Sequence, residues 1–292
     1  MTWSAHRPAV RNVADGEVGA VHARPDGTAT RPTADAAPVE ADGALLFGRY
    51  AFPPNERGYC GPDRAGELLE RVDAGAAGHA LEDVARGFEG AWPYLELISQ
   101  CLGRAPLDPV VVRTYWIGGV TLAQCGGAPF VDSLETRFRP RLTREEFERL
   151  AEGARAGATP HHGFHVFGVY PWVGLMRGGH GDEPLQVLDR CRIRWGRVLA
   201  LRGEVATVES RPLRWDGRRL RLGEPEVETA RVRRSGLGLA GDVEMGDWVS
   251  LHWDWICDRL TLADLRDLRR ATAYELAAVN SCRYSAPAAV LA

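Results

Sequence analysis

The sequence has no long apolar run and no lysine. No stretch of about 18 apolar residues occurs, and no apolar core follows the first charged residues, so we expect neither a membrane span nor an export signal. All 36 basic side chains are arginine, which we attribute to codon usage, and 39 acidic residues leave a formal net charge of -3. This balance provides no positive field to collect polyanions, so nucleic acid is not an expected partner. We expect a cytoplasmic protein.

Cysteine and the common catalytic motifs are also scarce. No phosphate-binding P-loop, serine-hydrolase elbow or Rossmann glycine pattern occurs at a strand-to-helix junction, which disfavours nucleotide binding and serine hydrolysis. A chain of 292 residues does not need disulfide bonds to fold, so free thiols in a reducing compartment are expected. The six cysteines are widely spaced: Cys60, Cys101, Cys125, Cys191, Cys257 and Cys282.

Composition and periodicity predict an α+β protein in four segments. Residues 1–42 have only isolated apolar residues and no periodicity, which predicts a disordered tail. The patterns predict a mostly α-helical domain over residues 43–185 and a small β-barrel with a C-terminal helix over residues 186–282. A second tail is predicted over residues 283–292.

Helical patterns dominate the first of these domains. Order is expected from Ala44, a breaker-rich stretch follows at residues 52–62, and a helix is expected to start near Asp63. Further helices are predicted over 81–102, bent at Pro93, over 109–118 and over 143–156, where Thr143 and Glu146 have capping-box spacing.

Short strands replace helices after Pro184. Residues 193–201 and 205–208 flank Arg202-Gly203 as the two strands of a hairpin, and a second turn is predicted at residues 215–218. Two more strands are predicted at 226–232 and 248–253. A final helix is expected from Thr261, with Asp264 at capping-box spacing.

Two motifs in the second domain carry a resemblance to a known family. The segment from Cys191 to Gly196-Arg197-Val198 and the segment Gly246-Asp247-Trp248-Val249-Ser250-Leu251-His252 occur in that order. Residues 188–282 thereby resemble the HypC/HupF family of nickel-iron hydrogenase maturation chaperones. The resemblance implies an OB-like barrel in which Cys191 and His252 are metal ligands holding iron that carries cyanide and carbon monoxide. The implied partner is a hydrogenase large-subunit precursor or another maturation factor.

The chemistry agrees with such a role. Low-spin iron with strong-field ligands suits one soft thiolate and one imidazole, and an incomplete protein ligand set permits release. The family's cysteine stands at the mature N-terminus, whereas 190 residues precede Cys191, which therefore has no free α-amine beside its thiol. We also expect that Arg190, Arg192 or Arg194 lowers the pKa of Cys191.

Other residues suggest different functions. His161, His162 and His165 lie within five residues and form a second candidate metal-binding segment, although no HExxH pattern accompanies them. Cys60, in a turn beside Arg57, is a candidate reactive thiol. A metal- or thiol-dependent enzyme using these residues is therefore the alternative to a chaperone. A packing role for all of these side chains also remains open.

Aromatic residues around His252 suggest protein binding. Tryptophan is enriched where proteins bind one another, although the same rings could pack the barrel. A cofactor-free scaffold joining two partners is the third hypothesis. The candidate partner-binding residues are Trp195, Trp248, Trp253 and Trp255.

Overall fold

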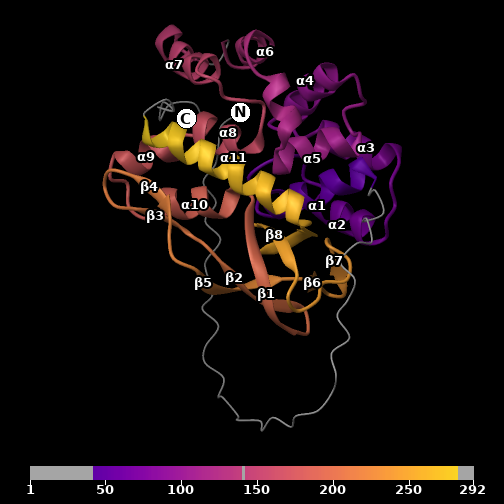
Figure 1. Ribbon diagram of the computed structural model, residues 1–292. Helices are drawn as coiled ribbons and strands as arrows, with labels where there is room; N and C mark the ends of the chain where they lie inside the picture. The colour runs from indigo at the N-terminus through magenta and orange to yellow at the C-terminus, as the bar shows by residue number, and fades with distance from the viewer. Residues whose placement is uncertain (1–41, 140–141, 282–292) are drawn as a thin grey trace. The chain divides into compact units, whose positions relative to one another are not determined.

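The computed structural model describes residues 42–139 and 142–281. The two predicted tails lie outside the described residues, apart from Asp42. The side chain of Asp42 accepts hydrogen bonds from the backbone N–H groups of Ala44 and Leu45, which caps the first helix. The described chain is α+β, with helices first, strands next and one long helix at the end (Figure 1).

Short helices make up the chain as far as residue 191. Two of them depart from α geometry: η1 is a 3-10 helix and η3 is a π-helical turn. The helices are α1 (Gly43–Glu56), α2 (Ala65–Asp73), α3 (His79–Arg86), α4 (Trp92–Leu102), α5 (Pro109–Ile117), η1 (Val120–Cys125), α6 (Ala128–Phe138), α7 (Arg144–Arg155), α8 (His162–Phe164), η3 (His165–Val169), α9 (Trp172–Arg177) and α10 (Glu183–Cys191).

Most of the helices that local signals predicted are confirmed, and two details were wrong. The capping box of Thr143 and Glu146 is present at the start of α7. The single bent helix over residues 81–102 is instead two helices, α3 and α4, because glycines 87 and 90 interrupt it. Pro93 lies in the first turn of α4, where its missing N–H breaks no hydrogen bond. Helix α1 continues through Pro53 and Pro54 into the stretch expected to be irregular.

The strands form a mixed sheet and two small hairpins. The main strands pair in the order β1-β2-β5-β9-β8, and β8 also pairs with β1. These pairs are antiparallel except β5 with β9, which meet at a single parallel pair. The strands are β1 (Arg194–Arg202), β2 (Val205–Ser210), β3 (Leu213–Trp215), β4 (Leu220–Leu222), β5 (Glu226–Arg231), β6 (Arg233–Arg234), β7 (Leu237–Gly238), β8 (Trp248–His252) and β9 (Trp255–Arg259).

A close approach between β1 and β2 explains one glycine of the sequence motif. A Cβ atom on Gly196 would lie 2.3 Å from a methyl carbon of Val208, so only glycine fits there. Small apolar side chains, including Val198, Ala206 and Val249, form a cluster among these strands. The two predicted hairpins, β1-β2 and β3-β4, are confirmed.

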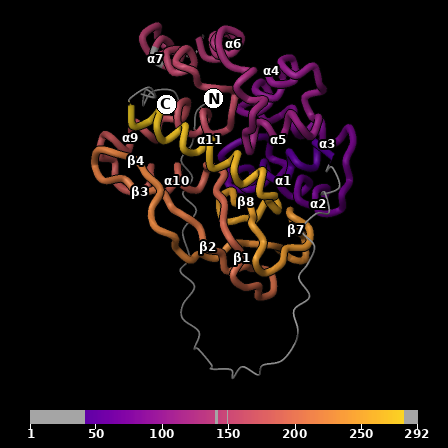
Figure 2. The backbone as a smooth tube through the Cα atoms, in the orientation of Figure 1, coloured from indigo at the N-terminus to yellow at the C-terminus, as the bar shows by residue number. Residues whose placement is uncertain are grey.

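Helix α1 joins the helical part of the chain to the strands. It packs against β8 and β9, and the chain trace in Figure 2 shows α1 beside β8. The Tyr50 hydroxyl lies 2.9 Å from the Ser250 hydroxyl, and the Arg49 guanidinium lies 2.9 Å from the Asp258 carboxylate. The predicted domain boundary after residue 185 falls inside α10, so the two predicted domains share this helix.

The last helix, α11 (Leu262–Asn280), crosses from the strands to the helices (Figure 1). Thr261 and Asp264 form the predicted capping box. The helix contacts β1 and β4 as well as α5, α8 and η3. Among the described residues, no helix combines the length and hydrophobicity needed to cross a bilayer.

Candidate metal centre

Three buried side chains from separate segments meet where the helices and strands join. His162, Cys191 and His252 each offer a ligand atom, and these atoms all lie within 4.8 Å of one another. Cys191 and His252 are the two ligands that the family resemblance implied, and His162 belongs to the histidine segment considered as a separate site. The structure therefore brings residues from both sequence hypotheses into one cluster.

Cys191 is the last residue of α10, where backbone carbonyls lack helical partners. The Arg190 carbonyl accepts a hydrogen bond from the Trp253 N–H at 2.7 Å. The Cys191 carbonyl lies 2.8 Å from Nε2 of His162. The end of α10 is thus tied to both histidine segments. A helix C-terminus also favours a bound cation.

The expectation that arginines activate Cys191 is wrong. Burial raises the pKa of the Cys191 thiol, and the neighbouring Cys60 raises it further. Arg190 and Arg194 instead pair with Glu228. Arg192 pairs with Asp189. The thiol is therefore protonated at neutral pH, and a metal ion would have to displace its proton.

His252 ends strand β8 and receives its orientation from α1. Its Nδ1 lies 2.7 Å from the Tyr50 carbonyl. In an α-helix that carbonyl would accept from the N–H four residues on, but residue 54 is a proline and has none. Pro54 thereby leaves the carbonyl free to accept the Nδ1 proton of His252. The lone pair of this imidazole is then on Nε2.

That Nε2 atom is buried and makes no hydrogen bond within the described residues. Burial lowers the pKa of His252 well below its ordinary value, and the neighbouring His162 lowers it further. The imidazole is therefore neutral. A buried, neutral nitrogen with an unused lone pair is what a metal ligand requires.

The turn after His252 holds an unusual backbone conformation. Trp253 has a φ of 54°, which is uncommon for a bulky residue. Tyr59 stacks on the Trp253 ring with centroids 4.6 Å apart, and Arg57 lies over the same ring. The Arg57 guanidinium also pairs with Asp254 at 2.5 Å. Contacts from the loop after α1 therefore fix the turn that positions His252.

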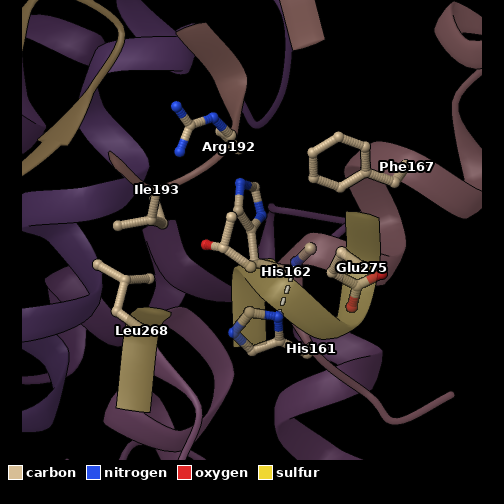
Figure 3. Close-up of a pocket in the computed structure, with 9 residues that line it drawn as sticks. His161, His162, Phe167, Arg192, Ile193, Leu268 and Glu275 are labelled. Atoms are coloured by element: carbon tan, nitrogen blue, oxygen red, sulfur yellow. Dashed lines mark hydrogen bonds between the residues drawn. The ribbon is translucent and has the colours of Figure 1, made fainter. Parts of the chain in front are cut away.

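His162 begins the short helix α8. The N-cap residue, His161, accepts a hydrogen bond at its Nδ1 from the Gly163 N–H, 2.9 Å away (Figure 3). Nε2 of His162 faces the Cys191 carbonyl, and Nδ1 lies 3.5 Å from the Tyr115 hydroxyl. Because a carbonyl oxygen can only accept, Nε2 carries the ring proton and donates it to Cys191, so Nδ1 has the lone pair that a metal ion would use. Burial lowers the pKa of His162 to about 4, so its ring too is neutral at pH 7.

The other two histidines of the segment stay outside the cluster. His161 caps α8 and lines a small pocket against α11, opposite Glu275 (Figure 3). His165 lies on the π-helical turn, with Nδ1 3.3 Å from the Tyr94 hydroxyl and its ring against Tyr170. Burial lowers the pKa of His161 to about 3 and that of His165 well below its ordinary value. Their part in metal binding stays a prediction.

A second cavity borders the cluster. Both Cys191 and His162 line it. The rest of its wall is mostly aromatic, which keeps it apolar. Cys60 also lines this cavity, so the two cysteines of the competing sequence hypotheses share one space.

The four tryptophans proposed for partner binding lie mainly in the interior. Trp195, Trp253 and Trp255 are at most 8% exposed, and Trp248 is half-buried. Arg269 of α11 lies over both Trp195 and Trp248. Their rings therefore pack the strands against the helices, and their role in partner binding stays a prediction.

The cluster has the composition of a transition-metal site. One thiolate and two imidazoles suit iron, zinc or copper, and the unused Nε2 of His252 fits such an occupant. Three protein ligands leave coordination positions for water or a small ligand. Sequence reasoning found all three residues but did not join His162 to the other two. The overlooked signal is Pro54, which has no N–H and therefore leaves the Tyr50 carbonyl free to accept from His252.

Comparison with known proteins gives one match. Neither the curated proteins nor the solved structures include a match to this chain. A family model matches residues 39–286, which span the described helices and strands. The chain therefore belongs to DUF6390, a family of unknown function.

Proposed function

We propose that this protein is an accessory chaperone of nickel-iron hydrogenase maturation that holds an iron-cyanide-carbonyl unit at His162, Cys191 and His252. One observation carries the proposal. The two ligands implied by resemblance to the HypC/HupF family lie far apart in the sequence, yet their ligand atoms fall within 4.8 Å, together with a third. The strand pairing order supports, as part of the proposal, an OB-like barrel of the HypC type.

The third residue, His162, compensates for a difference between this chain and that family. Cys191 follows a long helical segment and has no free amine beside it. His162, which comes from that helical segment, supplies an additional donor next to Cys191. The helical part thus has two roles in the proposal. It completes the ligand set, and it encloses the cargo until a partner protein binds.

The partner in this proposal is a hydrogenase large-subunit precursor or another maturation factor in the cytoplasm. Release to it requires that the ligand set be incomplete, since a saturated site would hold metal with about 10 kcal/mol or more. Three protein donors to iron that already carries diatomic ligands meet this condition. A thiolate of Cys191 and neutral imidazoles would hold the cargo without competition from protons on the histidines.

Infrared spectroscopy tests the proposal. Wild-type protein, Cys191→Ala and His162→Ala are purified without oxygen from cells that express the hydrogenase maturation machinery. We expect cyanide and carbonyl stretches in wild type, no such bands in Cys191→Ala, and weakened bands in His162→Ala. Cys257→Ala is the matched control, because this thiol is equally buried in the neighbouring strand β9 but is outside the cluster. Bands absent from wild type, or unchanged in Cys191→Ala, would refute the proposal.

A metal-dependent enzyme is the second candidate, and the cavity beside Cys191 and His162 favours it. Catalytic metal sites commonly have three protein ligands and one open position. Stoichiometric metal without cyanide or carbonyl bands would support this candidate over the chaperone.

A further inference from the structure

The partly buried residue Cys60 lines the cavity beside the proposed metal centre. Cys60, Cys191 and His162 line the same cavity. Cys60 is half-buried, as are Tyr59 and Trp172 in the same wall, whereas Cys191 and His162 are buried. The cavity therefore has partly exposed residues in its wall, among them one thiol, and buried residues, among them another.

The backbone around Cys60 is held in place by several contacts. The side-chain amide of Asn55 donates to the carbonyls of Cys60 and Pro62, both at 2.7 Å. Gly61 has a φ of +82°, and a Cβ there would lie 2.4 Å from the Phe88 ring. On the other side, Tyr59 stacks on the tryptophan that follows His252. The loop is thus anchored through its backbone and its neighbours, and the partly buried Cys60 side chain packs against the hydrophobic core at the wall of the cavity.

The buried centre needs a route for metal. His252 Nε2 is fully buried and makes no hydrogen bond within the described residues, so a metal ion that binds it has to leave bulk solvent. An ion stripped of its water shell needs replacement ligands on the way in, and a thiol is a suitable donor for the metals that such a centre takes. Cys60 is the thiol that shares the cavity with Cys191.

We propose that Cys60 is a capture ligand that binds a thiophilic metal ion first and passes it through the cavity to Cys191, His162 and His252. This inference rests on the proposed function, because it assumes that those three residues hold metal. In the first step Cys60 loses its proton to solvent as its sulfur–metal bond forms. In the second step that bond breaks as Cys191 binds the metal, and the proton that leaves Cys191 returns to the Cys60 sulfur. No electron is transferred.

Stopped-flow absorption with Co²⁺ alone tests the transfer, because thiolate-to-cobalt charge transfer reports each sulfur that binds. The chains are wild type, Cys60→Ser, Cys60→Ala and the control Cys101→Ser, which removes an exposed thiol that does not line the cavity. We expect loading at least about tenfold slower in both Cys60 variants, with the same final spectrum and stoichiometry as wild type. The control should load like wild type.

Each outcome separates this inference from the proposed function. Equal loading rates in wild type and the Cys60 variants overturn the capture role but leave the metal centre standing. A weaker final charge-transfer band in those variants also overturns it, because Cys60 would then be a permanent ligand. If wild type binds no cobalt, the metal centre itself is wrong and the capture role falls with it. Circular dichroism of each variant confirms that a rate change does not reflect unfolding.

Discussion

Replacing Gly163 with alanine tests the packing that places His162 in the metal centre. A Cβ at residue 163 would lie 2.8 Å from Cγ of Glu275 and 2.9 Å from Nδ1 of His161. Both distances are shorter than real Cβ contacts, so α8 and α11 would have to move apart. The same movement would weaken the hydrogen bond from the Gly163 N–H to the His161 ring.

The expected loss in the free energy of unfolding follows from these two effects. Overpacking of a buried position typically costs about 1–3 kcal/mol, and loss of a helix cap costs about 1 kcal/mol. We therefore expect the free energy of unfolding of Gly163→Ala to fall by about 2–4 kcal/mol. For a chain of this size that lowers Tm by about 4–16 °C. Because His162 is the adjacent residue, the affinity for Co²⁺ should fall as well.

Urea unfolding of the metal-stripped protein measures the effect. Gly66→Ala is the matched control, since Gly66 lies exposed in α2 and an added Cβ there meets nothing within 4 Å. The control should gain about 0.5–1 kcal/mol from the helix preference of alanine. If Gly163→Ala is as stable as wild type while the control behaves as expected, the packing described around His162 is wrong.

Three further predictions follow from the centre and its supports. Zn²⁺ at about 100 times its Kd should stabilise wild type by about 2.7 kcal/mol in thermal unfolding but leave His252→Ala unchanged, and equal stabilisation of both would exclude His252 as a ligand. The metal-stripped fold should lose stability as pH falls below about 6.5, because burial lowers the pKa of His161 to about 3 and that of His162 to about 4, so the unfolded chain binds protons that the folded chain does not. Urea titrations at pH 7 and pH 5 should differ by about 2 kcal/mol for each of these histidines, and a pH-independent midpoint would contradict their burial as neutral rings. Arg194→Met should cost about 1–3 kcal/mol in urea unfolding, because Glu228 and the Trp253 carbonyl lose a buried guanidinium donor although Glu228 keeps Arg190 and Ser210, whereas an unchanged midpoint would show that the pair contributes little.

Local signals in the sequence predicted much of the fold. The capping boxes of Thr143 and Thr261 each require residues three apart, so they can be read without knowing the tertiary structure. The hairpin turn at Gly203 is similarly local, and Gly203 adopts a φ of 58° there. The error over residues 81–102 arose because apolar periodicity continued across two glycines that end one helix and precede the next.

The candidate site could be predicted only in part, because its contacts are distant in sequence. The family resemblance pointed to Cys191 and His252, but nothing local joined His162 to them. The hydrogen bond from His162 to Cys191 spans 29 residues, and that from His252 to Tyr50 spans 202. The pKa of Cys191 was mispredicted because burial raises it, and burial depends on the tertiary packing; the arginines beside it pair with Glu228 and Asp189.

X-ray absorption at the zinc edge tests the metal centre most directly. Wild-type protein and Cys191→Ala are each loaded with one equivalent of Zn²⁺ and measured under the same conditions. The account predicts one sulfur and two imidazole nitrogens around zinc in wild type, as the cluster of His162, Cys191 and His252 provides, and no sulfur in Cys191→Ala. A wild-type spectrum without sulfur, or a sulfur shell that persists in Cys191→Ala, would contradict it.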